Sequence, residues 1–179
     1  LIRKALEMGA GAVLVADCRT AAEAEQIVRA AKFPPRGVRG YSGNCFSAGW
    51  GAHAGAAWVK WSNEQPLIGL VIEHPEGVEA ADAILSTDGI DFVQFGPADF
   101  AMAVGLGTPS PEDPRVRDAG ARVHAAARSR GRSVFLNVAA TGEAVAAARR
   151  SGAAMIELAT DLAVLRRTWQ AAVTARDTA

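Results

Sequence analysis

The sequence predicts an α/β fold in which short parallel strands alternate with helices. Short, continuous apolar runs recur along the chain, as expected for strands that are buried on both faces of a parallel sheet. Stretches with helical periodicity lie between these runs, and glycine, proline and aspartate mark the turns. This alternation is typical of βαβ units with right-handed crossovers.

Local signals define the elements of the first half. A helix over residues 1–8 stops at Gly9, and the apolar run 12–16 is a buried strand. The capping-box pattern from Thr20 to Glu23 opens a helix that runs to about residue 31. Residues 37–65 are rich in glycine and tryptophan, with one short helix expected at about 53–60. Connections of this length tend to be functional or disordered.

The second half repeats the strand–helix pattern more regularly. Its predicted elements are a strand at 66–73, a helix at 75–85, a strand at 90–95, a helix at 114–129, a strand at 133–138, a helix at 141–151, a strand at 154–159 and a helix at 161–175. Two architectures fit this order: an open doubly wound sheet, and a (β/α)₈ barrel without its first three strands. A complete barrel takes about 250 residues, and residues 1–8 read as a helix without its first turns, so we expect an upstream segment.

The composition limits the binding partners and the cellular location that we expect for this protein. The 19 basic residues balance the 19 acidic ones among 179 residues, which argues against a nucleic-acid or membrane-surface binder. No apolar run reaches the length of about 18 residues that a transmembrane helix needs, and no signal peptide is apparent. Cys18 and Cys45 form no disulfide framework and no CxxC motif. We therefore expect a cytoplasmic protein, with residues 1–179 forming a single, partial domain.

Two acidic residues follow neighbouring strands. Glu73 closes the strand at 66–73, and Asp99 comes shortly after the strand at 90–95. The carboxyl ends of parallel strands meet at one edge, which is where sites form in such folds. Two adjacent carboxylates raise each other's pKa unless a cation lies between them, and a hard ion such as Mg²⁺ or Mn²⁺ prefers oxygen ligands. The alternative is that each acid caps the helix after its strand.

Three blocks of sequence resemble the HpcH/HpaI aldolase/citrate lyase family. They are Phe33-Pro-Pro-Arg-Gly-Val-Arg-Gly40, Val71-Ile-Glu-His-Pro-Glu-Gly77 and Gly89-Ile-Asp-Phe-Val-Gln-Phe-Gly-Pro-Ala-Asp-Phe100, in the family's order and at its spacing. The similarity extends over essentially the whole chain. It implies a modified TIM barrel of the pyruvate/phosphoenolpyruvate type, with about five βα units present.

The resemblance also implies an activity. It indicates a metal-dependent class II aldolase that cleaves a 4-hydroxy-2-oxo acid to pyruvate and an aldehyde through an enolate. Glu73 and Asp99 would bind the metal, which is Mg²⁺, Mn²⁺ or Co²⁺, and Gly96, Pro97 and Ala98 would bind the substrate carboxylate. The family's proton-transfer histidine and substrate-binding arginine would lie upstream of residue 1, so the catalytic residues are unknown. The resemblance further implies a homo-oligomer, a trimer or a hexamer, in which the helix at 161–175 is exchanged between subunits.

Other residues near these blocks carry weaker indications. Ser42, after the Arg39-Gly40 pair, is a candidate for substrate binding at the pocket mouth. Where many family members carry a glutamine, this chain has Val71, and where many carry a proline it has Ala16. Asp17 then either lies at the edge of the sheet that carries the active site or caps the helix that begins at Thr20.

Two other functions fit the same residues. One is a citryl- or malyl-CoA-type lyase, which needs a basic patch for the CoA; Arg36 and Arg39 are the nearby candidates. The other is a non-catalytic oligomeric protein that binds 2-oxo acids and has lost the proton-transfer groups. A histidine and an arginine at the ends of upstream strands would favour the enzyme over this binding protein.

Overall fold

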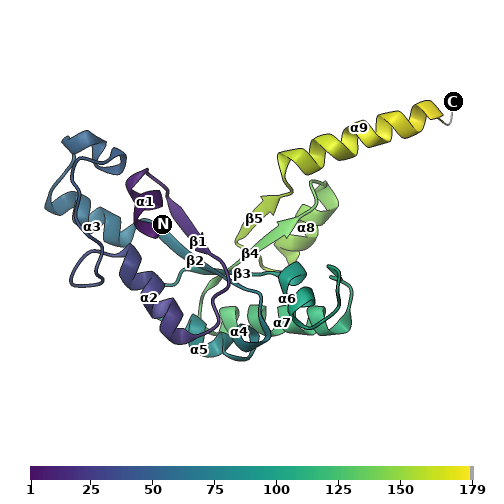
Figure 1. Cartoon of the computed structure of the whole chain (residues 1–179), viewed down its shortest axis with the longest axis horizontal. Helices are drawn as coiled ribbons and strands as arrows, with labels where there is room; N and C mark the ends of the chain where they lie inside the picture. The colour runs from purple at the N-terminus through teal and green to yellow at the C-terminus, as the bar shows by residue number, and fades with distance from the viewer. Residues whose placement is uncertain (178–179) are drawn as a thin grey trace. The chain divides into compact units, whose positions relative to one another are not determined.

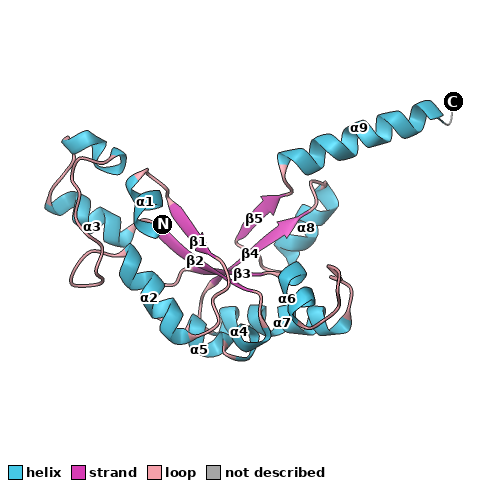
Figure 2. Cartoon of the chain, in the orientation of Figure 1, coloured by secondary structure: helices cyan, strands magenta, loops and turns pink. Residues whose placement is uncertain are grey.

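The chain alternates strands and helices throughout, as the magenta and cyan segments of Figure 2 show. This computed structural model describes residues 1–177, which fall into two compact units that divide after Ser133. The strands pair in parallel within each unit. The predicted α/β class is therefore confirmed.

The first unit is built on three parallel strands in the order β1-β2-β3. Its elements are α1 (Ile2–Glu7), β1 (Ala12–Val15), α2 (Ala21–Ala31), the 3₁₀ helix η1 (Phe46–Gly51), α3 (Ala56–Glu64), β2 (Leu67–Ile72), α4 (Pro75–Glu79), α5 (Ala81–Leu85), β3 (Phe92–Phe95), α6 (Pro97–Ala103) and α7 (Pro114–Ser129). Figure 1 shows α2, α5 and α7 along the same side of these strands. Consecutive helices of this layer pack on each other, and α2 and α7 also contact β2 and β3.

The core of the first unit lies between this helix layer and the strands. Ile68, Leu70 and Ile72 of β2 are fully buried, as expected for the central strand of the three. Ile84 and Val123 are the matching fully buried side chains of α5 and α7. Burial of this apolar surface provides the main stabilisation of the unit and fixes the strand ends that carry the site.

The capping signals of the sequence are confirmed. Thr20 Oγ1 accepts a hydrogen bond from the amide of Glu23, and the Glu23 carboxylate accepts the amide of Thr20 in return. Asp113 caps α7, whose first residue is Pro114. Each of these contacts satisfies amide groups that a helix leaves without an internal partner at its first turn.

Four elements differ from the prediction. The helix expected at 75–85 is two short helices that meet at Ala80: Gly77 places α4 against the chain after β1, whereas α5 packs on α2 and α7. The short helix expected at 53–60 is α3, which begins later, at residue 56. Two elements were not predicted: η1, within the glycine-rich segment, and α6, where Pro97 begins a helix directly after Gly96 instead of extending a turn.

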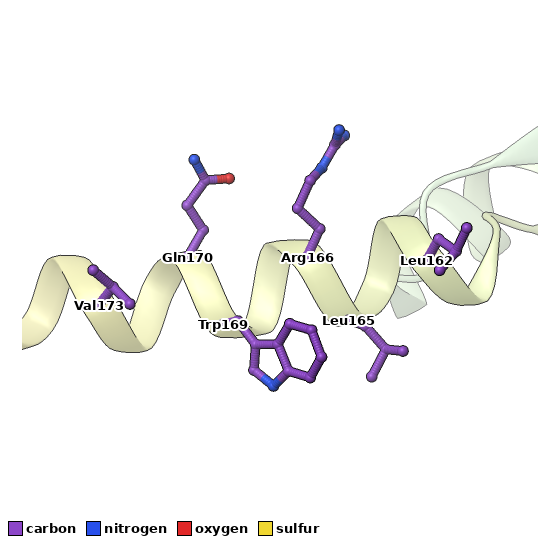
Figure 3. Close-up of a pocket in the computed structure, with 6 residues that line it drawn as sticks. All are labelled: Leu162, Leu165, Arg166, Trp169, Gln170 and Val173. Atoms are coloured by element: carbon purple, nitrogen blue, oxygen red, sulfur yellow. The ribbon is translucent and has the colours of Figure 1, made fainter.

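The second unit pairs two parallel strands. Its elements are β4 (Ser133–Val138), α8 (Gly142–Arg150), β5 (Met155–Leu158) and α9 (Asp161–Asp177). Figure 3 shows that Leu165 and Trp169 project from one side of α9, whereas Arg166 and Gln170 project from another. Leu162, Leu165, Trp169 and Val173 of α9 are exposed, with Trp169 at 66%. Within residues 1–177, no helix has both the length and the apolar character that a membrane crossing requires.

Candidate metal and active site

Glu73 and Asp99 come from neighbouring parallel strands. Glu73 directly follows β2, whose last residue, Ile72, pairs with Phe95 at the end of β3. Asp99 lies in the first turn of α6, which begins two residues after β3. Glu73 is half-buried and Asp99 is exposed. The parallel register therefore brings the two carboxyl groups to the same edge of the first unit.

The electrostatics of Glu73 reflect the proximity of Asp99. Burial raises the pKa of Glu73, and the negative charge of the nearby Asp99 raises it further. The amide of Asp17 opposes this shift, because it donates a hydrogen bond to Glu73 Oε1 at 3.0 Å. Without a cation, the two carboxylates therefore repel each other, and a shared positive charge would relieve that repulsion.

These donors suit a hard divalent cation. Both are carboxylate oxygens, which Mg²⁺ and Mn²⁺ prefer over nitrogen or sulfur. In the described part of the chain, no third histidine, cysteine or acidic side chain joins them to form a cluster of three. Mg²⁺ is commonly held by only one or two carboxylates, with water and substrate oxygens as its other ligands. The pair therefore fits a metal that keeps positions open for a substrate.

The segment from Gly96 to Ala98 lies directly beside Glu73. The Gly96 amide donates to Ile72 O at 3.0 Å, which holds the end of β3 against the end of β2. A Cβ at Gly96 would overlap Glu73 Oε2 and lie 2.7 Å from Glu73 Cβ. Pro97 and Ala98 are exposed in the first turn of α6. The small residue at 96 thus lets the Glu73 carboxylate reach the edge where Asp99 lies.

Asp17 lies at the same edge of the first unit as Glu73 and Asp99, and the sequence left its role open. Its amide contacts Glu73, while its carboxylate accepts two hydrogen bonds from Arg19, at 2.8 and 2.7 Å. The Asp17 pKa is lowered, chiefly by that contact with Arg19. Thr20 and Glu23 form the cap of α2. Asp17 therefore lies at the edge that carries the two acids and does not cap α2. The contact of its amide with Glu73 was not predicted, because no pattern of residue types signals it.

Ser42 lies elsewhere in the first unit. The segment from residue 32 to residue 66 joins the end of α2 to the beginning of β2, so it lies at the amino ends of the strands, and Phe46 packs there against Gly9. Glu73 and Asp99 lie at the carboxyl ends. The structure thus does not bring Ser42 to the acid pair within one chain, and its substrate role stays a prediction.

The two candidate arginines have structural contacts at that amino-terminal side. Arg39 is buried, and its guanidinium stacks 4.5 Å from the centre of the Phe33 ring. Arg36 donates to the backbone oxygen of Asn63 at 3.0 Å. His74, next to Glu73, caps α4 by accepting the Glu76 amide on Nδ1.

Comparison with known proteins gives the chain its family. The profile of the HpcH/HpaI aldolase/citrate lyase family matches residues 1–168. A hydroxypyruvate/pyruvate aldolase from Pseudomonas aeruginosa is 36% identical over 134 residues, 73% of this chain and 50% of that protein. A 4-hydroxy-2-oxovalerate aldolase from Novosphingobium aromaticivorans is 39% identical over 59% of this chain and 39% of that protein.

Solved structures agree with the sequence comparison. A crystal structure of an HpcH/HpaI aldolase/citrate lyase family protein from Burkholderia cenocepacia matches with a TM-score of 0.87 and 30% identity, over 98% of this chain and 69% of that one. The fold and the two acids at its strand ends define the class of the protein, a barrel-type α/β protein. The chain belongs to the HpcH/HpaI aldolase/citrate lyase family. The predicted TIM-barrel fold is confirmed. The chain spans about half the length of the first curated relatives that it matches.

Proposed function

We propose that the protein is a metal-dependent carbon–carbon lyase, a class II aldolase, that cleaves a 4-hydroxy-2-oxo acid to pyruvate and an aldehyde. The observation that carries this proposal is the placement of Glu73 and Asp99 at the carboxyl ends of two neighbouring parallel strands, where the charge of Asp99 raises the pKa of Glu73. Family membership and the aldolase names of the relatives support the reaction class.

In this proposal, Glu73 and Asp99 hold a divalent cation, Mg²⁺ or Mn²⁺. The bound cation supplies Lewis acidity, which stabilises the negative charge that develops on the oxo acid as its carbon–carbon bond breaks. Gly96, Pro97 and Ala98 would bind the substrate carboxylate beside this cation, and the absence of a side chain at position 96 leaves room for Glu73. No residue of the chain is assigned to proton transfer.

The test is exchange of the methyl protons of pyruvate with D₂O, followed by NMR on the full-length protein. Exchange requires enolate formation but needs no knowledge of the aldehyde. We expect exchange that depends on Mg²⁺ and that is abolished by Glu73→Ala and by Asp99→Ala. Asp82→Ala is the matched control, because Asp82 is an exposed acid paired with Arg130. Absence of exchange with Mg²⁺ bound would refute the lyase and favour a non-catalytic binding protein.

We also propose that α9 packs against another subunit of a homo-oligomer. Leu162, Leu165, Trp169 and Val173 are all at least 46% exposed on this helix, which is an unusual amount of apolar surface for one helix to leave in water. Replacing Trp169 by Glu should dissociate the assembly in sedimentation-velocity experiments, whereas Arg167→Glu, on the other side of α9, should not. An unchanged assembly in Trp169→Glu would exclude α9 from the interface.

A further inference from the structure

The turn after β1 has an unusual backbone. Asp17 has a φ of 56°, in the left-handed region that residues with a side chain seldom adopt and that aspartate tolerates better than most. The residue lies two positions beyond the end of β1. Non-glycine residues in this conformation cluster at functional sites, and they persist only where the surrounding contacts hold them.

Contacts on both sides hold this turn. The Asp17 carboxylate is bound by two atoms of Arg19: Nε donates to Oδ1 at 2.8 Å and Nη2 to Oδ2 at 2.7 Å. The next residue, Cys18, is buried, and its amide donates to Val71 O at 3.1 Å. The turn is therefore tied to β2 just before Glu73, and its geometry is determined by the fold.

The consequence of this turn is the direction of one amide group. The Asp17 N–H points at Glu73 Oε1 and donates a hydrogen bond of 3.0 Å. The other oxygen of Glu73, Oε2, lies over Gly96, on the segment that leads to Asp99. One oxygen of Glu73 is thus occupied by the protein, and the carboxylate has a fixed orientation before any ligand arrives.

We propose that Asp17 is a positioning residue for Glu73. Its left-handed backbone keeps Oε1 on the amide and leaves Oε2 to bind the divalent cation, so Glu73 acts through one oxygen. This inference rests on the proposed metal site at Glu73 and Asp99. A glutamate without this hydrogen bond loses conformational freedom when the cation binds, which weakens binding. Loss of a hydrogen-bond partner of a metal ligand lowers the metal affinity by about 10-fold or more.

Substitutions can separate the backbone role of Asp17 from its charge. Asp17→Gly and Asp17→Asn keep the left-handed turn, because both residues accept positive φ, and should bind Mn²⁺ nearly as tightly as the unsubstituted chain. Asp17→Val disfavours the turn, withdraws the N–H and should weaken Mn²⁺ binding by about 10-fold. Affinities are measured by isothermal titration calorimetry on the full chain.

Trp50→Val is the matched control. Trp50 also has positive φ, at 53°, but it lies in η1, at the amino-terminal side of the strands. This variant should lose stability without any change in Mn²⁺ affinity. If Asp17→Val fails to fold by circular dichroism, Asp17→Ala replaces it, because alanine also disfavours positive φ but adds no branched side chain; it should also weaken Mn²⁺ binding.

The outcomes separate the two proposals. Equal Mn²⁺ affinity for the folded Asp17→Val variant and the unsubstituted chain would overturn the positioning role while leaving the metal site intact. Unchanged affinity in Asp17→Ala would do the same where that variant replaces Asp17→Val. A loss in Asp17→Gly and Asp17→Asn as large as in Asp17→Val would assign the effect to the carboxylate and would also overturn it. No Mn²⁺ binding by the unsubstituted chain would overturn the metal site and this inference together.

Discussion

Gly96 and Glu73 approach each other so closely that position 96 has no room for a side chain. A Cβ there would overlap Glu73 Oε2, lie 2.7 Å from Glu73 Cβ and lie 3.2 Å from Val71 Cγ1. Gly96 does not have the positive φ that would otherwise explain a glycine, since its φ is −95°. The glycine is therefore required by the position of the Glu73 carboxylate.

Gly96→Ala should damage the proposed metal site more than the fold. The new methyl group must push the Glu73 carboxylate aside, so we expect Mn²⁺ affinity to fall by about 10-fold. Overpacking of this kind costs about 1–3 kcal/mol of unfolding free energy. Titration calorimetry and chemical denaturation measure the two effects. Gly11→Ala, where a Cβ would meet no atom within 4 Å, is the control; equal affinity in both variants would contradict the prediction.

Gly69 is a second close approach, and it tests the core. Gly69 of β2 pairs with Phe92 of β3, and a Cβ at Gly69 would overlap the Phe92 ring, 2.6 Å from Cδ2. Since Phe92 is buried and cannot move into solvent, Gly69→Ala should destabilise the chain by about 1–3 kcal/mol in urea denaturation. Adding Phe92→Leu should recover part of this loss, because it removes the ring atoms that clash. No recovery in the double variant would show that the cost arises elsewhere.

Much of the fold could be predicted because its signals are local. The capping box of Thr20 and Glu23 lies within four consecutive residues, and apolar runs such as residues 67–72 need only the alternation of strand and helix to be interpreted. The juxtaposition of Glu73 and Asp99 could also be predicted, since parallel strands put their carboxyl ends at one edge. Their roles as ligands remain proposals.

The parts that escaped prediction depend on contacts distant in sequence. The amide of Asp17 reaches Glu73 only because the turn after β1 adopts positive φ, and nothing in the residue types around Asp17 requires that conformation. The break at Ala80 has a similar origin. A Cβ at Gly77 would lie 2.7 Å from Cys18 O, so α4 is held against the end of β1 while α5 packs on α2 and α7.

Cys18 should be chemically inert in the folded chain. Burial and the charge of Glu23 raise the pKa of its thiol to about 11, so only about one thiol in a thousand is ionised at pH 8. Cys45 is half-buried and should react first. We expect Ellman's reagent to modify one thiol at pH 8 in the native chain and two in urea. In Cys45→Ser, rapid modification of the native chain would show that Cys18 is accessible.

His124 should make the unfolding free energy fall as the pH drops. His124 lies in α7, and its Nε2 is buried without a hydrogen-bond partner among the described residues. Burial lowers the pKa of its imidazole, and the charge of Arg128 lowers it further. The unfolded chain therefore takes up a proton near pH 6.5, before the folded chain does. The contribution of His124 to the free energy of unfolding is fully present above that pH and declines below it, until the folded imidazole is also protonated. The slope is at most about 1.4 kcal/mol per pH unit for this one group.

Urea denaturation between pH 7.5 and pH 5 should show a smaller decline in His124→Leu than in the unsubstituted chain, with Arg128→Gln between the two. Identical slopes in the unsubstituted chain and His124→Leu would mean that the acid sensitivity comes from other groups.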